Sequence, residues 1–446
     1  MKISIIGTGY VGLIAGTCLA DFGLQVICVD QDETKISLIN SGGVPIYETN
    51  LEDLIQKNVS AGRLIFTTDL ENTVKQSKVI FIAVGTPSND DGSANLQQIE
   101  KVAQQIAASM NEYKVIVNKS TVPIGTATKI KEIINQNVIA RSEATKQSQP
   151  TSKPFAFDIV SNPEFLREGS AVYDFTHPDK IVIGTESDRA LKIMQEIYRP
   201  LYLIDTPFVI TNPETAELIK YACNAFLATK ITFINEIANL CDKLGADVHQ
   251  VAKAMGLDGR ISPKFLHPGP GYGGSCFPKD TEALYHFSST CGYEFKLLKG
   301  VISANKRQRE LMIEKIKYHL GDLKSKTIAI LGLAFKQNTD DIRKSPSIDI
   351  INLLLKEGAH IRCFDPLAME NTKKILPDLT YCQDEYETAR DSNALIIVTE
   401  WNQFRNLDLL KIKKLLKSPI LLDLRNLYDP EKAKALGFTF EGVGRK

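Results

Sequence analysis

Residues 2–12 have the sequence KISIIGTGYVG, in which a short apolar run rich in β-branched residues leads directly into a Gly-x-Gly-x-x-Gly pattern. The run predicts a buried strand, and Gly7, Gly9 and Gly12 predict a tight turn that opens a helix. A second apolar run follows and ends in Asp30, about twenty residues beyond the glycines. This order of elements is typical of a dinucleotide-binding fold.

NAD is the expected ligand of the glycine turn. The glycines let the backbone approach a pyrophosphate at the positive amino end of the following helix. Asp30 can accept hydrogen bonds from ribose hydroxyls, and its charge would repel the 2′-phosphate of NADP. We therefore predict NAD rather than NADP, with a helix-packing turn that binds no ligand as the alternative.

Length and composition indicate a large protein with several domains and no strong charge preference. The chain has 446 residues, and its 53 basic side chains balance 53 acidic ones. This balance argues against broad binding to nucleic acids or anionic membranes. Eight cysteines without a Cys-x-x-Cys pattern are typical of free thiols in a reducing compartment, and no apolar run is long enough to span a bilayer. We expect a cytoplasmic protein with no nucleic-acid or membrane partner.

Further apolar runs at 78–84, 114–117 and 157–160 continue the α/β alternation. Each is followed by a polar or turn-forming stretch, and in a parallel sheet such stretches lie at the strand ends where ligands bind. Three loops should therefore converge on the cofactor. The stretch 140–153 is polar and rich in Ser, Thr and Gln, so we expect an exposed insertion without a catalytic role.

Residues from Pro213 to about Leu244 are predicted to form one long helix, closed by Gly245. Most of its surface is apolar, which predicts a buried helix that joins two lobes or two subunits. Lys220 and Asn224 lie one turn apart and share a face. Because a buried charge is costly unless paired, we expect Lys220 to face a polar cavity, with a solvated helix face as the alternative.

The opening pattern returns in the last third of the chain. A strand at 327–331 and a later strand ending in Asp365 repeat the layout of the first two strands. The three-glycine fingerprint is missing, and Lys336 and Arg343 follow the first strand instead. Since cations can hold phosphates where helix-terminal amides are not arranged to do so, the pattern predicts a second nucleotide-binding fold with a ligand other than NAD.

Cys276 lies in the stretch GGSCFPKD at 273–280. A thiol is the best side-chain nucleophile near neutral pH, but it needs positive charge and backbone donors nearby, which Lys279 and the glycine amides can supply. A structural cysteine beside a turn is the alternative. Cys276 has no second cysteine or histidine at ligand spacing, so no metal site is expected.

Together these motifs resemble the UDP-glucose/GDP-mannose dehydrogenase family along essentially the whole chain. The resemblance rests on GTGYVG at 7–12, STVPIGT at 120–126, NPEFLREG at 162–169, Lys220 with Asn224, GYGGSCFPKD at 271–280 and GLAFK at 332–336. The stretch 140–153 falls outside it, as do Pro268 and Pro270 before the cysteine.

The resemblance implies an NAD-dependent four-electron oxidation of UDP-glucose to UDP-glucuronate. The first hydride transfer makes an aldehyde at C6, which Cys276 would trap as a thiohemiacetal. The second makes a thioester, which water hydrolyses. The same chemistry on GDP-mannose or an N-acetylated UDP-sugar is one alternative, and a non-catalytic NAD-binding sensor is another.

The resemblance also implies roles for individual residues. The catalytic set is Cys276 as nucleophile, Lys220 and Asn224 as oxyanion stabilisers, Asp280 as the residue that orients or deprotonates water, Glu164 as acid or base, and Thr121 as the holder of a water. Implied cofactor contacts are Gly7, Gly9, Tyr10, Val11, Gly12, Asp30, Lys35, Thr86, Thr121, Glu168, Lys279 and Arg343. Implied substrate contacts are Glu164, Phe165, Leu166, Lys220, Asn224, Arg260, Phe265, Tyr272, Gly273, Phe335 and Lys336.

The resemblance also implies that Arg260 reaches into the sugar-nucleotide site of a neighbouring subunit, so at least a homodimer is expected. The glycines around Cys276 are interpreted as room for the sugar. The predicted fold class is α/β, with two Rossmann-like doubly wound domains joined by a long central helix. The expected domains are an NAD-binding domain at 1–206, a central helical region for dimerisation and the active site at 207–305, and a UDP-sugar-binding domain at 306–446.

Overall fold

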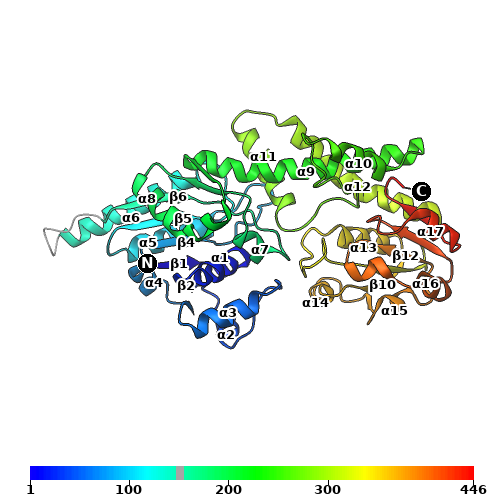
Figure 1. The fold of residues 1–446 in the computed structure, drawn as a ribbon, viewed down its shortest axis with the longest axis horizontal. Coiled ribbons are helices and arrows are strands. Elements are labelled where there is room, and N and C mark those ends of the chain that lie inside the picture. The colour runs from blue at the N-terminus through cyan, green and yellow to red at the C-terminus, as the bar shows by residue number, and fades with distance from the viewer. Residues whose placement is uncertain (147–154, 446) are drawn as a thin grey trace. The chain divides into compact units, whose positions relative to one another are not determined.

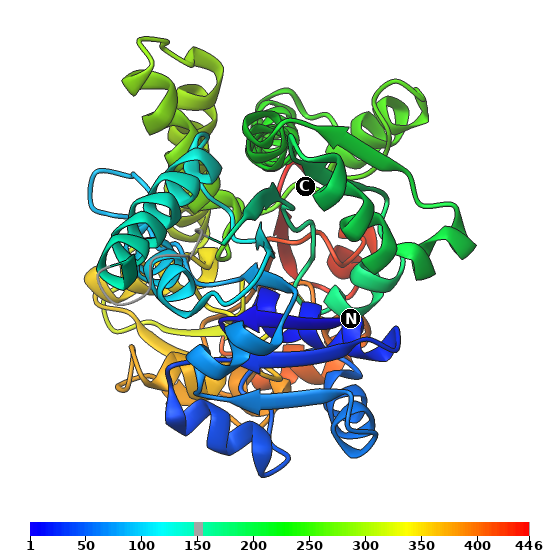
Figure 2. The same cartoon turned by 90° about the vertical axis from the view of Figure 1, so that its left-hand side faces the viewer.

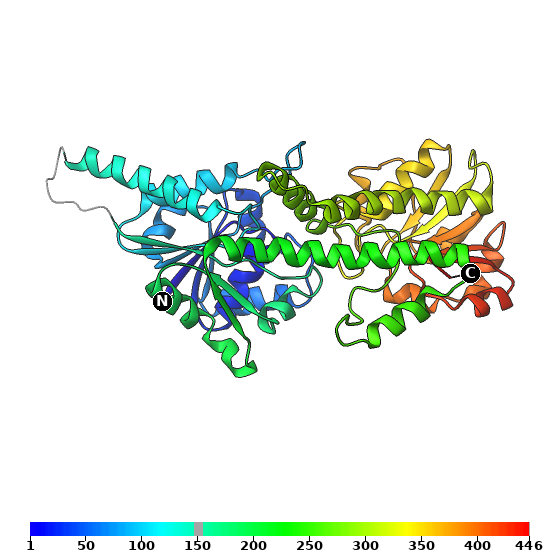
Figure 3. The same ribbon diagram turned by 90° about the horizontal axis from the view of Figure 1, so that it is seen from above.

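A computed structural model of the chain describes residues 1–146 and 155–445. The chain divides into two compact units, Met1–Ala222 and Cys223–Lys446 (Figure 1). One long helix, α9 (Pro213–Leu244), begins in the first unit and ends in the second; it is the bright green helix in Figure 3. Within the described ranges, none of the helices combines the length and apolar composition that crossing a bilayer requires.

The described part of the first unit contains an eight-stranded sheet with the order β3-β2-β1-β4-β5-β6-β7-β8. The strands are β1 (Lys2–Ile6), β2 (Gln25–Val29), β3 (Leu64–Thr67), β4 (Val79–Ile82), β5 (Lys114–Asn118), β6 (Phe157–Ser161), β7 (Ile181–Gly184) and β8 (Phe208–Thr211). All neighbours are parallel except β6 and β7, and Ile5 of β1 lies opposite Cys28 and Phe81. The predicted strands are confirmed as β1, β2, β4, β5 and β6.

Helices cover both faces of this sheet, as Figure 2 shows for the blue and cyan strands. They are α1 (Tyr10–Asp21), α2 (Glu33–Asn40), α3 (Leu51–Ser60), α4 (Leu70–Gln76), α5 (Gln97–Ser109), α6 (Thr126–Lys146), α7 (Ala171–Thr176) and α8 (Asp188–Ile197), followed by a 3-10 helix, η1 (Arg199–Ile204). Strand side chains alternate between two cores: Ile3 and Ile5 pack with α1, α3, α7 and α8, whereas Ile6 packs with α5 and α6. The period of two places one core on each face.

The predicted insertion at 140–153 is helical in its first half. Helix α6 continues to Lys146, while residues 147–153 lie outside the described residues. Polar composition does not exclude a helix, because Ala, Glu, Lys and Arg in this stretch have high helix propensity.

The described part of the second unit contains a six-stranded parallel sheet with the order β11-β10-β9-β12-β13-β14. The strands are β9 (Thr327–Leu331), β10 (His360–Phe364), β11 (Thr380–Tyr381), β12 (Ala394–Ile397), β13 (Ile420–Asp423) and β14 (Thr439–Gly442). The helices are α10 (Val248–Leu257), α11 (Phe277–Thr290), α12 (Lys296–Leu320), α13 (Pro346–Lys356), α14 (Met369–Lys373), α15 (Glu385–Ala389), α16 (Leu409–Leu415) and α17 (Pro430–Ala435), with a 3-10 helix, η2 (Asn402–Asn406). This order repeats the first six strands of the other sheet, which confirms the predicted pair of doubly wound domains.

Helix α9 has the predicted limits but not the predicted burial. Phe226, Phe233 and Leu240 are 65%, 49% and 49% exposed, whereas Ile234 and Ala238 are fully buried. The exposed residues recur every seven positions and so form one stripe, which we call the α9 stripe. Within a single chain only part of the apolar surface of α9 is buried, so the predicted burial is only partial there. Burial against a second subunit stays a prediction.

Glu217, near the start of α9, binds the amino end of α6. Its carboxylate accepts hydrogen bonds from the amides of Gly125 (2.7 Å) and Ala127 (2.9 Å) and from Ser161 Oγ (3.2 Å). Burial raises the pKa of Glu217 to about 7, although these donors act in the opposite direction. The contact also fixes the end of the loop that follows β5.

The raised pKa of Glu217 predicts a pH-dependent stability. A carboxyl whose pKa rises from 4.5 to about 7 on folding favours the folded state at low pH. As the pH rises through 7, the free energy of unfolding falls by up to about 3 kcal/mol because this carboxyl ionises. The Tm of Glu217→Gln should therefore rise relative to that of the wild type between about pH 4.5 and about pH 7.5. Glu236→Gln, at an exposed position of the same helix, is the control. A Tm difference for Glu217→Gln that does not change with pH would contradict the assignment.

The turn between β1 and α1 has free space at only one of its three glycines. Gly7 has φ +100°, and a Cβ there would lie 2.6 Å from Ala83 O. A Cβ on Gly12 would lie 1.9 Å from Gly7 O, so both glycines are required by the fold itself. Gly9 is extended, and a Cβ there would meet no protein atom within 4 Å. This open space at Gly9 fits a pyrophosphate at the start of α1.

Alanine substitutions should separate these two requirements. Gly9→Ala should fold, with stability within about 0.5 kcal/mol of the wild type, but should bind NAD at least about tenfold more weakly. Gly12→Ala should lose stability severely because its methyl group overlaps the Gly7 carbonyl. Thermal melts and NAD titration measure both effects. Unchanged NAD affinity in Gly9→Ala would argue against a pyrophosphate at this turn.

Candidate functional site

Asp30, directly after β2, is positioned beside the glycine turn. Its Oδ2 accepts hydrogen bonds from Thr8 N (2.9 Å) and Thr8 Oγ1 (2.8 Å) and pairs with Lys35 Nζ at 2.9 Å. Partial burial would raise the pKa of Asp30, but Thr8 and Lys35 outweigh it and hold the pKa below its usual value. The carboxylate therefore stays ionised and suits the ribose hydroxyls expected of NAD.

The other predicted cofactor residues lie on loops that are linked to one another. Thr86 Oγ1, after β4, donates to Thr121 O, after β5, at 2.8 Å. Tyr10, which opens α1, is hydrogen-bonded to Glu48, and Glu48 accepts from Gly169 N at 2.8 Å. Glu48 thus joins the glycine turn to the loop that contains Glu168. Glu48 was not predicted, because nothing in its local sequence links it to residues more than a hundred positions away.

Glu164 and Lys220 form a buried ion pair in the first unit. Lys220 Nζ lies 3.0 Å from Glu164 Oε1, and the two side chains are 4% and 5% exposed. Glu164 Oε2 accepts from Leu166 N at 2.6 Å, and Lys220 Nζ lies 5.3 Å from the centre of the Phe165 ring. Burial alone would raise the pKa of Glu164, but Lys220, Leu166 N and Lys119 keep it below the usual value. Four predicted substrate residues are therefore brought together.

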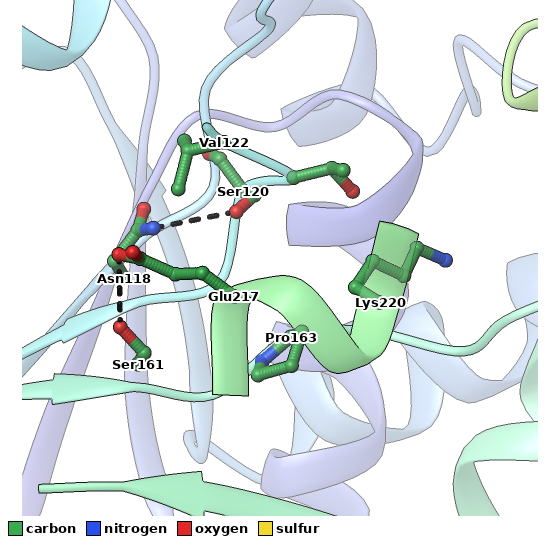
Figure 4. A pocket seen from close by; sticks show the side chains of 8 residues that line it. Asn118, Ser120, Val122, Ser161, Pro163, Glu217 and Lys220 are labelled. Carbon is green, nitrogen blue, oxygen red and sulfur yellow. Dashed lines mark hydrogen bonds between the residues drawn. The ribbon is translucent and has the colours of Figure 1, made fainter. Parts of the chain in front are cut away.

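A small polar pocket, large enough for about one water molecule, lies beside this pair (Figure 4). It is lined by Asn118, Ser120, Thr121, Val122, Ser161, Pro163, Glu217 and Lys220. In Figure 4 Glu217 points toward Asn118 and Ser161, whereas the Lys220 ammonium points away from them. Lys220 thus lines the pocket, but its charge is met by Glu164 rather than by the polar groups of the pocket. Its burial does not fit the alternative of a solvated helix face.

In the second unit, Cys276 immediately precedes α11. Its carbonyl accepts from Asp280 N at 2.8 Å in the first turn of that helix, and Ser275 Oγ lies 3.4 Å from its Sγ. A position at the amino end of a helix favours the thiolate, because the helix dipole is positive there. Asp280 is 1% exposed and accepts from Asn224 Nδ2 (2.5 Å) and Lys279 Nζ (2.6 Å). Four predicted residues are thus adjacent around this helix start.

At the glycines before Cys276, the space that a side chain would occupy is already filled by other parts of the chain. A Cβ on Gly271 would lie 2.8 Å from Asn305 Oδ1, and one on Gly273 would lie 2.4 Å from Lys344 O. A Cβ on Gly274 would lie 2.7 Å from the Phe335 ring. On this side the glycines allow close packing of the chain, and a sugar on the other side of their backbone stays a prediction. A substrate contact by the Gly273 backbone stays a prediction.

Polar side chains of α12 hold the same loop through its backbone. Asn305 accepts from Tyr272 N (2.8 Å) and donates to Tyr272 O (3.2 Å), Gln308 donates to Gly269 O (2.9 Å), and Arg309 donates to Tyr272 O (2.9 Å). None of the three was predicted. No helix was predicted over this stretch; a helix prediction there would have placed positions 305, 308 and 309 on one face.

The remaining predicted residues have the following surroundings. Phe265 and Tyr272 pack near Phe277, with ring centroids 6.2 Å and 6.1 Å away. Arg260 is paired with Asp258 and 90% exposed, and Arg343 is paired with Asp341 and 64% exposed. Lys336 Nζ lies 5.6 Å from the Phe335 ring centre. Val11, in the first turn of α1, is half-buried. Their roles stay predictions.

Asp365 explains why the second sheet differs from the first at the same position. It is fully buried and accepts from Leu333 N (2.7 Å), Ala334 N (3.1 Å) and Trp401 Nε1 (3.0 Å). Its acceptors are thus committed to the protein, which fits the prediction of a ligand other than NAD. In the part of the chain that the structure describes, no group of three or more His, Cys, Asp or Glu side chains is arranged to hold a metal.

Comparison with known proteins covers the whole chain. Family profiles match residues 1–202, 214–307 and 329–430, and they describe the NAD binding domain, the central domain and the UDP binding domain of the UDP-glucose/GDP-mannose dehydrogenase family. The UDP-glucose 6-dehydrogenase of Rhizobium meliloti (strain 1021) is 48% identical, covering 100% of both chains. That of Bacillus subtilis (strain 168), named TuaD, is 46% identical over 100% of this chain and 93% of its own.

Among solved structures, a UDP-glucose dehydrogenase from the archaeon Pyrobaculum islandicum superposes with a TM-score of 0.90 at 35% identity. The match covers 100% of this chain and 98% of that one. Both nucleotide-binding sheets, the central helix and the cysteine at the start of α11 thus occur in a chain whose sequence matches one family throughout. The chain belongs to the UDP-glucose/GDP-mannose dehydrogenase family.

Proposed function

We propose that this chain is an NAD-dependent UDP-glucose 6-dehydrogenase, which oxidises UDP-glucose to UDP-glucuronate. The names of the relatives that share 46% and 48% of its residues over full length support this activity. The main structural support is Cys276 at the amino end of α11, with Asp280 and Asn224 beside it. A simple alcohol oxidation needs no nucleophile, whereas oxidation of an alcohol to an acid in one site needs a group that retains the aldehyde.

In the first oxidation the C6 alcohol loses a hydride and a proton and becomes an aldehyde. NAD supplies the hydride acceptor in this step and in the second. Glu164, kept ionised by Lys220, takes the proton directly or through a water held by Thr121. Lys220 and Asn224, one turn apart on α9, donate to O6 as negative charge develops there.

In the second oxidation the Cys276 thiolate attacks the aldehyde. The new S–C6 bond forms as the carbonyl electron pair moves to O6, and O6 takes up one proton, which gives a thiohemiacetal. Loss of a second hydride and a proton makes a thioester. Water oriented by Asp280 then adds to C6, the S–C6 bond breaks, and the thiolate returns. The balance is UDP-glucose, two NAD⁺ and one water to UDP-glucuronate, two NADH and three protons.

The assembly proposed for this activity is a homodimer or a higher homo-oligomer. The α9 stripe exposes large apolar side chains, which a second copy would cover. Arg260 is exposed and so is available to the sugar-nucleotide site of that copy. A reactive thiol needs a reducing compartment, which favours the cytoplasm.

The ratio of NADH formed to sugar nucleotide consumed tests the reaction. With UDP-glucose we expect two NADH for each UDP-glucose, and little turnover of GDP-mannose or UDP-N-acetylglucosamine at matched concentrations. One NADH would reduce the reaction to a simple alcohol oxidation. Binding of NAD without turnover would support a non-catalytic sensor. Faster turnover of GDP-mannose than of UDP-glucose would show that GDP-mannose is the preferred substrate.

Replacing the thiol tests the covalent route. Cys276→Ala should lose glucuronate formation by at least about a thousandfold, while its Tm and NAD affinity stay at wild-type values. Cys291→Ala, at the exposed cysteine after the same helix, should keep full activity and serves as the matched control. Glucuronate formation by Cys276→Ala at the wild-type rate would rule out the thioester.

A further inference from the structure

A second buried lysine contacts the stretch after β6 that contains Glu164. Lys119 directly follows β5 and is 4% exposed. Its Nζ donates to Asn162 O at 3.4 Å and to Asn162 Oδ1 at 3.3 Å, and it lies 5.9 Å from the centre of the Phe175 ring. Within the described residues, no carboxylate lies at ion-pair distance from this ammonium.

Such burial needs a reason, because two long hydrogen bonds to neutral oxygens do not offset the cost of removing an ammonium from water. The Lys119 charge acts instead on ionised groups slightly further away. The Glu164 carboxylate favours the charged form of Lys119, whereas the Lys220 ammonium disfavours it. Lys119 Nζ contacts Asn162, two residues before Glu164, so two buried cations act on one buried carboxylate.

The groups that face Lys119 come from several elements. Glu164 follows β6, and Lys220 lies on α9. Tyr198, after α8, donates its hydroxyl to Asn162 Oδ1 at 2.6 Å, and burial raises the pKa of this hydroxyl, so it stays neutral. Burial and the charge of Lys220 together lower the pKa of Lys119 to about 8 against the pull of Glu164, so most Lys119 side chains are charged at neutral pH.

We propose that Lys119 is a positioning residue of the active site, whose buried positive charge keeps Glu164 ionised as the proton acceptor while Lys220 is engaged with the substrate oxygen. The inference rests on the roles proposed above for Glu164 and Lys220. Lys220 cannot donate fully both to Glu164 and to the O6 oxyanion. When its charge is neutralised by that oxyanion, Glu164 loses much of its stabilising cation. Lys119 has no such second task, because its hydrogen bonds go to Asn162.

The pH dependence of kcat/KM for UDP-glucose tests this role. Removing a nearby cation raises the pKa of a carboxyl, so the acid limb of the profile should move up by about one pH unit in Lys119→Met and Lys119→Gln. Activity near the acid limb should then fall about tenfold and recover at higher pH. Lys119→Arg keeps the charge and should restore the wild-type limb.

Lys114 provides a matched control. It lies on the adjoining strand β5, is fully buried, and donates to Ser77 O at 2.8 Å. Lys114→Met should cost stability, as any loss of a buried lysine does, without moving the acid limb. A decrease in Lys119→Met and Lys119→Gln by the same factor at every pH would overturn the proposal and leave a structural role only.

A second measurement does not depend on turnover. The Tm difference between a protein and its Glu164→Gln variant changes over the pH range in which Glu164 titrates. In the Lys119→Gln background this change should occur about one pH unit higher than in the wild type. An unchanged range would refute the proposal even if the protein acted on another substrate, whereas wild-type inactivity on UDP-glucose would refute only the proposed function.

Discussion

The Lys220 ammonium is almost completely buried, so the protein must place a carboxylate next to it. Glu164 meets this requirement at 3.0 Å, from the turn that follows β6, and Leu166 N holds the second oxygen of that carboxylate. The ion pair therefore ties α9 to the edge of the sheet where the strands end. The loop after β5, the polar pocket and the environment of Lys119 all depend on that junction.

The two sheets share one topology but present different chemistry at the same edge. After β2, Asp30 faces an open glycine turn and stays ionised beside Lys35. After β10, Asp365 is buried and its oxygens bind Leu333 N, Ala334 N and Trp401. Amides of the turn bind the carboxylate in both sheets. The difference is that Asp30 stays partly exposed beside Lys35, whereas Asp365 is fully buried beside Trp401.

Some glycines leave space for a ligand and others allow close packing of the chain, and the sequence does not show which is which. Gly9 has open space where a side chain would be, whereas Gly12, Gly273 and Gly274 allow one part of the chain to approach another. Around Cys276, this close approach and the amide contacts from α12 fix the backbone before the nucleophile. Rigid support of this kind is what positions a reactive group for attack.

The sequence alone determined β1, β2, β4, β5 and β6 of the first sheet, the first two strands of the repeat, both limits of α9 and the family. Hydrophobic period, glycine spacing and helix-ending signals act over a few residues, whereas β3, β7 and β8 carried no signal strong enough to be predicted. The sequence also identified the residues now found together, including Glu164 with Lys220 and Asn224 with Asp280, but through motif resemblance rather than distance. Only the tertiary structure revealed Glu48, Lys119, Glu217 and Asn305 as supports of the site. Their partners come from elements that are distant in sequence, and no local pattern records which buried polar groups will meet when those elements pack.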